Sequence, residues 1–216
     1  MAVLATFFFG SPKLQLSLPE RYILSGKFHP LHRGHLAVAH YVKEKFNKII
    51  LFEIPSFTPQ RGMIPVGSTT NKLLVDDKMS KIIRQFDILN RDLVITDDIT
   101  FTAKSRTFGN CTFVVGPEVL AKFCNPVSYF QSIKETKRCI EMFKLNGGKF
   151  LVVPRTIDQA EYGFKIPNII RDVTTIADDF RPIEISSTEI RADLKKIEID
   201  RDKKARIKAI EEGKTE

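Results

Sequence analysis

All four histidines of this chain lie in one short stretch, residues 25–40, and His32 and His35 stand on either side of Gly34 in the word His-Arg-Gly-His. Two side chains at this spacing lie on the same face of a helix, so both imidazoles can point at one ligand. Gly34 between them allows a ligand to approach the backbone closely. This pair is the first candidate for chemistry.

The residues around the pair predict a strand, a turn and a helix. Tyr22–Leu24 is typical of a short buried strand, Gly26–Gly34 is rich in turn residues, and apolar side chains then recur at helical spacing, which predicts a helix that begins near Leu31. In a parallel sheet such a turn lies at the carboxyl edge, where the start of the helix offers free N–H groups and a positive dipole end. Phosphate is the ligand that suits this arrangement.

Two other interpretations of the histidines were weighed. A structural zinc site needs four closely arranged ligands, often cysteines, and Cys111, Cys124 and Cys139 are widely spaced, so no metal ligand is assigned. His40 falls inside the predicted helix and is interpreted as an ordinary helix residue, whereas His29 is left without a role.

A second motif, Ile-Ser-Ser-Thr-Glu-Ile-Arg at residues 185–191, follows the strand-like segment Arg181–Ile185 and opens a long charged helix. Ser186 and Glu189 have the spacing of a capping box. Three consecutive hydroxyl groups, with Arg191 one turn later, also form a set of donors suited to phosphate oxygens. One turn can serve both purposes.

Together these motifs resemble those of the HxGH nucleotidylyltransferases, and in particular their nicotinamide mononucleotide adenylyltransferase-like, or cytidylyltransferase-like, branch. The first motif is Gly26-x-Phe28-x-Pro30-x-His32-x-Gly34-His35, and the second is Ile-Ser-Ser-Thr-x-Ile-Arg. The resemblance extends over roughly residues 21–195. Further similar segments are Thr100-Phe101 with Lys104, residues 112–116 and residues 149–153.

The resemblance implies a single α/β Rossmann-like domain with a mainly parallel sheet flanked by helices. It implies transfer of a nucleotidyl group, in which a phosphate monoester attacks the α-phosphorus in line and pyrophosphate leaves, with Mg²⁺ bound through the phosphates and ATP as substrate. The catalytic residues would be His32, His35 and Arg191. The nucleotide-binding residues would be Gly26, Lys27, Phe28, Gly34, Gly116, Glu118, Ser186, Ser187 and Thr188.

The acceptor is less closely specified. Adenylyl transfer to nicotinamide mononucleotide is the leading reaction. The alternatives are adenylyl transfer to pantetheine phosphate and cytidylyl transfer from CTP to a small phosphate ester. Glu118 stands where the family loop usually carries aspartate, and the chain has no tryptophan to stack on a nicotinamide ring, which leaves Phe57 or Phe101 for that role. Arg84, Lys104 and Arg106 are candidates for holding the acceptor phosphate, and ordinary solvated cations are the alternative.

Lys78-Met79-Ser80-Lys81 matches the core of the second signature of class I aminoacyl-tRNA synthetases. However, Val75, Met79, Ile82, Phe86 and Leu89 form an apolar helical stripe, which predicts that Met79 is a core residue. A chain of 216 residues also leaves little room for a synthetase and a tRNA-binding module.

The composition agrees with one globular domain. The chain has 43% hydrophobic residues, and its net charge of +8 suits either phosphate-rich ligands or nucleic acid. We expect an N-terminal arm or edge strand over 1–20, the nucleotidylyltransferase domain over 21–195 and a charged C-terminal helix or tail over 196–216. Three unpaired cysteines favour a reducing, cytoplasmic location, with the nucleus as a further possibility.

The apolar run at residues 1–9 is too short to span a bilayer, so we expect an edge strand or packed arm and no membrane partner; a signal peptide is the alternative. A homo-oligomer is possible from the sequence.

Strands are predicted at 49–53, 93–96, 111–115 and 150–153, helices at 35–46, 71–89, 119–124 and 133–145, and a long loop near the site at 55–70.

Three classes of function follow from these observations. The first is the nucleotidylyltransferase, and the second is a nucleotide-binding regulator or weak ATPase that keeps the phosphate site without productive transfer. The third is a basic nucleic-acid-binding module. The sequence has no stretch of interleaved aromatic and basic residues, which argues against this third class. Acceptor-dependent release of pyrophosphate distinguishes the first from the second.

Overall fold

The sheet is parallel throughout the part of the chain that the structure describes. The structure is a computed structural model, and it describes residues 6–8, 20–55, 77–96, 98–126, 132–183 and 190. Each pairing of neighbouring strands is parallel, and the strand order is β1-β4-β3-β2-β5-β6-β7. The strands are β1 (Thr6–Phe8), β2 (Arg21–Ser25), β3 (Ile50–Pro55), β4 (Leu93–Thr96), β5 (Cys111–Val115), β6 (Gly148–Val152) and β7 (Thr174–Ile176).

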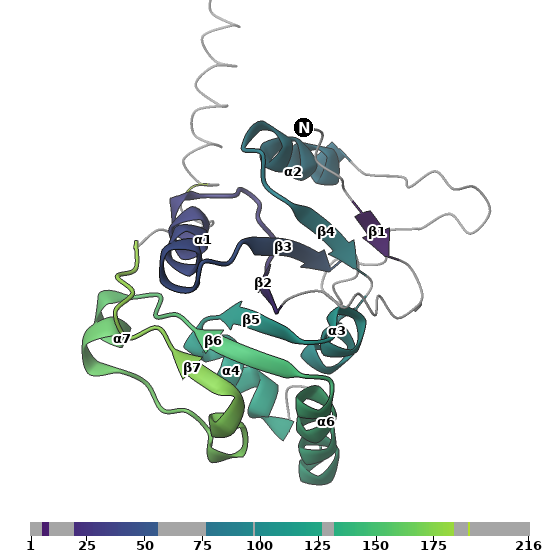
Figure 1. The fold of residues 1–216 in the computed structure, drawn as a ribbon, viewed down its shortest axis with the longest axis vertical. Coiled ribbons are helices and arrows are strands. Elements are labelled where there is room, and N and C mark those ends of the chain that lie inside the picture. Colours follow the sequence, from purple (N-terminus) through teal and green to yellow (C-terminus); the bar gives the residue numbers. More distant parts are fainter. Residues whose placement is uncertain are drawn as a thin grey trace, which may run out of the picture.

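The order of the strands reverses between β2 and β5 (Figure 1). The chain runs outward from β2 through β3 to β4, and then returns to β5, which pairs with the other side of β2 before the chain continues through β6 to β7. In doubly wound folds of this kind, ligands bind outside the carboxyl ends of the strands at this reversal. The topology therefore places the turn after β2 and the turn after β5 side by side at the expected ligand site.

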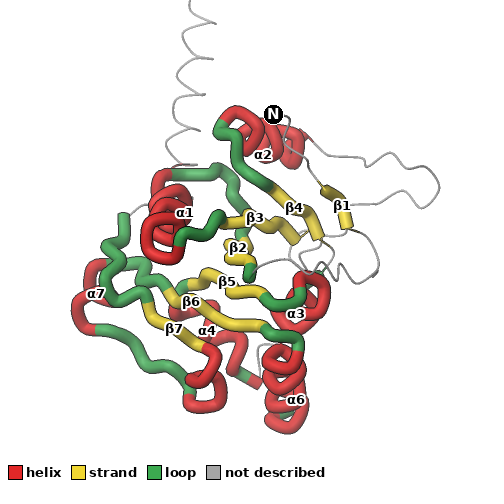
Figure 2. Tube along the Cα trace, viewed as in Figure 1, coloured by secondary structure: helices red, strands yellow, loops and turns green. Residues whose placement is uncertain are grey.

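Helices lie on both faces of the sheet and enclose two apolar clusters (Figure 2). Successive side chains of β2 alternate between them, with Tyr22 and Leu24 in one cluster and Ile23 in the other, as the strand period requires. The first cluster contains residues of α1 (Arg33–Phe46) and α2 (Asp77–Ile88). The second contains residues of α3 (Phe101–Phe108), α4 (Pro117–Cys124), α6 (Ile133–Leu145) and the 3₁₀ helix η1 (Asn168–Val173).

The predicted α/β fold with a parallel sheet and flanking helices is confirmed. The strands predicted at 93–96 and 111–115 and the helix predicted at 133–145 have the predicted bounds, and the N-terminal run contributes the edge strand β1. Met79 is buried in the first cluster, which agrees with its prediction as a core residue. In the described part of the chain, no helix is both long and apolar enough to cross a membrane.

The sequence predicts a strand at Arg181–Ile185, and the structure corrects this prediction. Residues 181–183 form no strand, and residues 184 and 185 lie outside the described residues; the last strand within the described residues is β7, which pairs with β6. A turn follows β7, in which the Phe180 N–H donates to the Ala177 carbonyl, and Pro182 has no N–H with which to continue a ladder. The α7 helix (Ile157–Tyr162), α3 and β7 were not predicted from the sequence.

Candidate functional site

The two histidines of the His-Arg-Gly-His word lie together at the start of α1. The helix begins at Arg33 rather than at the predicted Leu31, so that His32 is its N-cap residue and His35 lies in its first turn, as does Gly34. Their rings stack with centroids 3.7 Å apart and an interplanar angle of 26°. The structure thus places both imidazoles beside the free N–H groups of a helix start, at the carboxyl end of β2.

A backbone hydrogen bond assigns the tautomer of His35. The His32 N–H donates to Nδ1 of His35 at 3.3 Å, so in the neutral ring the proton is on Nε2. The Phe28 ring also contacts His35 edge to face, with centroids 5.0 Å apart. His35 is therefore held as an Nε2–H donor, which is the form that can bind a phosphate oxygen.

Both imidazoles are neutral near pH 7. The pKa of His35 is lowered from 6.5 to about 3, chiefly by burial and in addition by the neighbouring His32 and the positive charge of Arg155. Burial, followed by the charge of Arg155, also lowers the pKa of His32. An anion placed against these rings would reverse the effect, because a nearby negative charge favours the protonated form.

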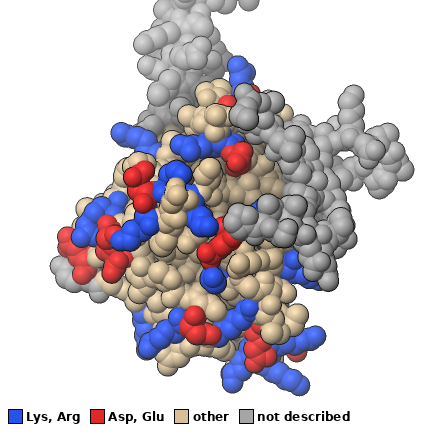
Figure 3. Space-filling model, in the orientation of Figure 1, with Lys and Arg blue, Asp and Glu red and all other residues tan. Residues whose placement is uncertain are grey.

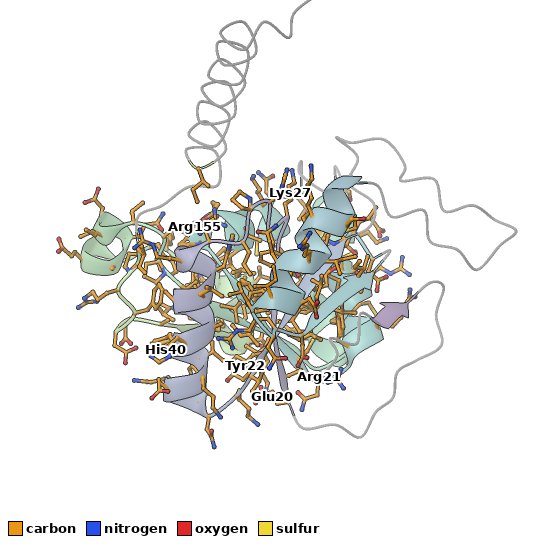
Figure 4. All side chains as sticks on the ribbon, turned by 90° about the horizontal axis from the view of Figure 1, so that it is seen from above. Glu20, Arg21, Tyr22, Lys27, His40 and Arg155 are labelled. Carbon is orange, nitrogen blue, oxygen red and sulfur yellow. The ribbon has the colours of Figure 1, made fainter. Side chains whose placement is uncertain are left out.

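Arg155 belongs to this site, although the sequence analysis did not single it out. It follows β6, and its guanidinium Nη1 lies 2.8 Å from Oε1 of Glu118 in the first turn of α4, the helix after β5. Seen from above, Arg155 lies with Lys27 at one edge of the sheet, and Glu20 and Arg21 lie at the opposite edge (Figure 4). A cation directly after a predicted central strand was the signal that could have identified it.

The turn between β2 and α1 is tied to its neighbours at several points. The Gly26 N–H donates to the Glu53 carbonyl at 2.9 Å, and the Leu31 N–H donates to Oε1 of Gln85 on α2 at 3.0 Å. Phe28 has φ of 39°, an uncommon backbone conformation for a bulky residue, and its buried ring packs edge to face against Phe52 and Phe86. The aromatic contacts hold this turn in its conformation.

The three cations proposed for the acceptor are not gathered at the histidine pair. Arg84 and Arg106 have exposed side chains on α2 and α3, and within the described residues neither bonds to His32 or His35. Lys104 is 3% exposed and forms an ion pair with Glu53 at 2.7 Å. A cation neutralised inside the protein is not presented to a ligand, so the structure does not support the acceptor role considered for Lys104.

Phe101 requires a similar correction. It is buried in the second apolar cluster, where its ring contacts Phe113, Phe123 and Phe150, so it does not replace a tryptophan as a stacking surface. His40 lies exposed on α1, as interpreted from the sequence. The predicted residues that lie outside the described part of the chain are Phe57, Ser186, Ser187, Thr188 and Arg191.

The described residues contain no group of three or more histidine, cysteine or acidic side chains arranged to hold a metal ion. At the turn after β2, the described groups are imidazoles, backbone N–H groups and nearby cations, and Glu118 is paired with Arg155. This set consists mainly of hydrogen-bond donors, which suits phosphate oxygens.

Comparison with known proteins identifies the family of the chain. The model of the family described as cytidylyltransferase-like matches residues 23–193. Two relatives are both named probable nicotinate-nucleotide adenylyltransferase: one from Vesicomyosocius okutanii is 24% identical over 79% of this chain and 82% of its own length. The other, from Dictyoglomus turgidum, is 40% identical over 23% of this chain and 25% of its own length. The chain belongs to the cytidylyltransferase-like family of nucleotidyltransferases.

Proposed function

We propose that this protein transfers an adenylyl group from ATP to a pyridine mononucleotide and releases pyrophosphate. The observation that carries the proposal is the stacked His32–His35 pair at the start of α1, at the reversal of strand order and within the electrostatic influence of Arg155. Two imidazoles, a helix N-terminus and a guanidinium form a site for a polyanion. The family match and the names of the two relatives support the same reaction class.

In the proposed reaction, an oxygen of the acceptor phosphate attacks the α-phosphorus of ATP. The bond between the α-phosphorus and the oxygen that bridges it to the β-phosphate breaks, and pyrophosphate leaves. His35 donates its Nε2–H to a non-bridging oxygen of the α-phosphate, and His32 binds the neighbouring oxygens. Arg155 exchanges its contact with Glu118 for the phosphates and neutralises the charge that develops. Catalysis then consists of positioning and charge stabilisation, and it needs no covalent intermediate.

Magnesium fits this site as an ion carried by the phosphates. The described groups around the histidine pair are mainly nitrogen donors, whereas Mg²⁺ prefers oxygen ligands and is commonly held by substrate phosphates with few protein ligands. When bound, it neutralises charge on the triphosphate. Ser186, Ser187, Thr188 and Arg191 are proposed to hold the β- and γ-phosphates, on the sequence motif alone.

The acceptor in the proposal is nicotinamide or nicotinate mononucleotide. The sequence motifs resemble the nicotinamide branch, whereas both relatives carry the nicotinate name, so the two mononucleotides are the first acceptors to compare. The proposed nucleotide donor is ATP. CTP is the competing donor to test, because Glu118 stands where the family loop usually carries aspartate and the longer side chain can change the contact with the base.

A panel of donors and acceptors tests this function. ATP and CTP are each combined with nicotinamide mononucleotide, nicotinate mononucleotide, phosphopantetheine and phosphocholine, and pyrophosphate is measured together with the organic product. We expect ATP with a pyridine mononucleotide to give pyrophosphate and dinucleotide in equal amounts. Bound ATP without release stimulated by any acceptor would instead identify a nucleotide-binding regulator or weak ATPase.

A salt titration tests the remaining class of function. Basic and acidic side chains alternate over much of the described surface in view (Figure 3). Binding to nucleic acid that falls steeply with added salt, and that ATP does not compete, would favour the nucleic-acid-binding module.

A further inference from the structure

A complete ion pair is buried under the phosphate-binding turn. Glu53 is 0% exposed and Lys104 is 3% exposed, and the Lys104 ammonium donates to Oε2 of Glu53 at 2.7 Å. The second carboxylate oxygen accepts a hydrogen bond from the Thr96 hydroxyl at 2.6 Å. Both oxygens of a fully buried carboxylate thus have partners.

The topology explains why these groups meet. Ser25, the last residue of β2, is the register partner of Glu53 within β3, and Thr96 ends β4. By strand alternation the side chain of Ser25 lies on the same face of the sheet as that of Ile23, which packs in the second cluster with Phe101 of α3. Lys104 lies one turn after Phe101 and reaches the polar end of this face.

The network is bonded directly to the start of the turn. The Lys104 ammonium also donates to the Ser25 hydroxyl at 3.3 Å, and the Glu53 carbonyl accepts the Gly26 N–H at 2.9 Å. Ser25 and Gly26 are the last residue of β2 and the first residue of the turn that leads to His32. One buried carboxylate residue therefore fixes the exit of β2 through its side-chain partner and through its backbone.

Burial of two charges is costly, and a buried ion pair is often no more stabilising than an apolar pair of similar volume. Such a pair contributes directional bonds that an apolar pair cannot make. Here the bonds hold the strand end whose exit direction sets the position of both imidazoles, and misplacement of reacting groups by about 1 Å can lower a rate by about a hundredfold.

We infer that Lys104 and Glu53 are positioning residues, which hold the exit of β2 so that His32 and His35 meet the nucleotide phosphates. The expected loss of turnover rests on the proposed function. The expected effects on the turn and on nucleotide binding do not depend on it. Lys104 acts through its bond to the Ser25 hydroxyl, and the Glu53 carboxylate acts by holding the Lys104 ammonium in place. The backbone bond from Gly26 to Glu53 is the same in every side-chain variant. Neither residue contacts the substrate.

The test is the double variant Glu53→Gln, Lys104→Met, which removes both charges together. The single variant Lys104→Met would leave a buried unpaired carboxylate and is prone to unfold. In the double variant, the carboxamide oxygen introduced at position 53 can still accept from Thr96, so we expect cooperative unfolding to persist. We expect weaker binding of magnesium ATP by about tenfold, turnover lower by about 10- to 100-fold, and faster amide exchange in residues 25–36.

The chain offers a control for the change of residue types at the opposite edge of the same sheet. Glu20 accepts from Lys149 at 3.0 Å and from the Thr112 hydroxyl at 3.0 Å, so the same three residue types meet there, but the Lys149 and Glu20 side chains are 49% and 28% exposed. The variant Glu20→Gln, Lys149→Met makes the same chemical change with the same net charge. We expect its ATP affinity, KM and turnover to equal those of the wild type.

Three results separate the possible outcomes. Unchanged ATP affinity and unchanged exchange in residues 25–36 of the folded double variant would overturn the inference. Activity of the double variant could instead fall only as far as its lower thermal stability reduces the folded fraction, with KM unchanged. That result would show a merely structural role and would also overturn the inference. Absence of transferase activity in the wild type would defeat the proposed function alone, because ATP affinity and amide exchange would still test the positioning role.

Discussion

His35 is a neutral ring whose proton position is set by the backbone of His32, and in the proposed site it donates to the ligand. Because its pKa is already lowered to about 3, the ring has a large capacity to gain a proton when negative charge arrives. Triphosphate binding and proton uptake should therefore be coupled at this residue.

We predict that bound ATP raises the pKa of His35 above its value in the free protein. Proton uptake on binding means that affinity for the triphosphate increases as the pH falls through the raised pKa toward the free value of about 3, apart from the opposing effect of protonation of ATP itself. Titration of the imidazole Cε1–H resonance by NMR, with and without a non-hydrolysable ATP analogue, measures both values. Equal pKa values in the two states would contradict direct contact between this ring and the phosphates.

The pKa of His35 also affects folding stability. Its folded value is lower than its ordinary value of 6.5, so its neutral form contributes stability that is complete above 6.5 and is lost as the pH falls toward about 3. In the variant His35→Gln, the free energy of unfolding should fall less over this interval. Urea denaturation at several pH values compares the two slopes, and parallel slopes would show that His35 is not buried in its neutral form.

Loss of the His35 imidazole should reduce turnover strongly. By analogy with removal of one donor from an oxyanion site, His35→Ala is expected to lower kcat by about a hundredfold to a thousandfold. His40→Ala is the control, since His40 lies exposed on the same helix. Normal turnover of His35→Ala, measured as pyrophosphate release, would remove His35 from the mechanism.

The sequence predicted that His32 and His35 lie together, as they do, but it did not predict the pairing of Lys104. Adjacent motif residues such as His32 and His35 can be recognised because their spacing alone places them together. Lys104 appeared as an isolated cation because its partner, Glu53, is distant in the chain. A single carboxylate in the apolar strand Ile50–Pro55 was a signal of pairing, since buried charges require partners.

At the scale of elements, the turn after β2 depends on close contact between a glycine and an aromatic ring. A Cβ atom at Gly26 would lie 2.9 Å from two ring carbons of Phe28. That ring is 2% exposed and packs against Phe52, Phe86 and His35, so it has little room to move.

Gly26→Ala should consequently lower the free energy of unfolding by about 1–3 kcal/mol and weaken ATP binding. Gly116→Ala is an informative comparison, because its Cβ would meet the ends of the longer side chains of Glu118 and Arg155, which can move apart. We expect it to cost less stability. Denaturant unfolding with calorimetric ATP titration checks both variants, and equal stability of Gly26→Ala and wild type would contradict the packing argument.

Elements with a continuous apolar pattern were predicted well, and elements without one were missed. The helix α3 buries Phe101, Lys104 and Ser105, so two of these inward positions are polar and the helical stripe of apolar residues is absent. The strand β7 has three residues, two of them exposed. Their formation depends on tertiary partners, which include Glu53 for α3 and β6 for β7.

At the scale of the whole molecule, the strand order brings three separate turns to one edge of the sheet. The start of α1 after β2 supplies the histidines, the start of α4 after β5 supplies Glu118, and the segment after β6 supplies Arg155. Doubly wound sheets bind nucleotides at this position because helix starts and strand ends converge there. The account therefore depends on where the triphosphate lies relative to this edge.

A crystal structure of the complex with magnesium and α,β-methylene ATP is the most direct measurement of that position. We predict that Nε2 of His35 lies within about 3.2 Å of an α- or β-phosphate oxygen, and that Arg155 has left Glu118 for the phosphates. A nucleotide bound elsewhere, with the ion pair between Arg155 and Glu118 intact and the histidines without phosphate contact, would contradict the account.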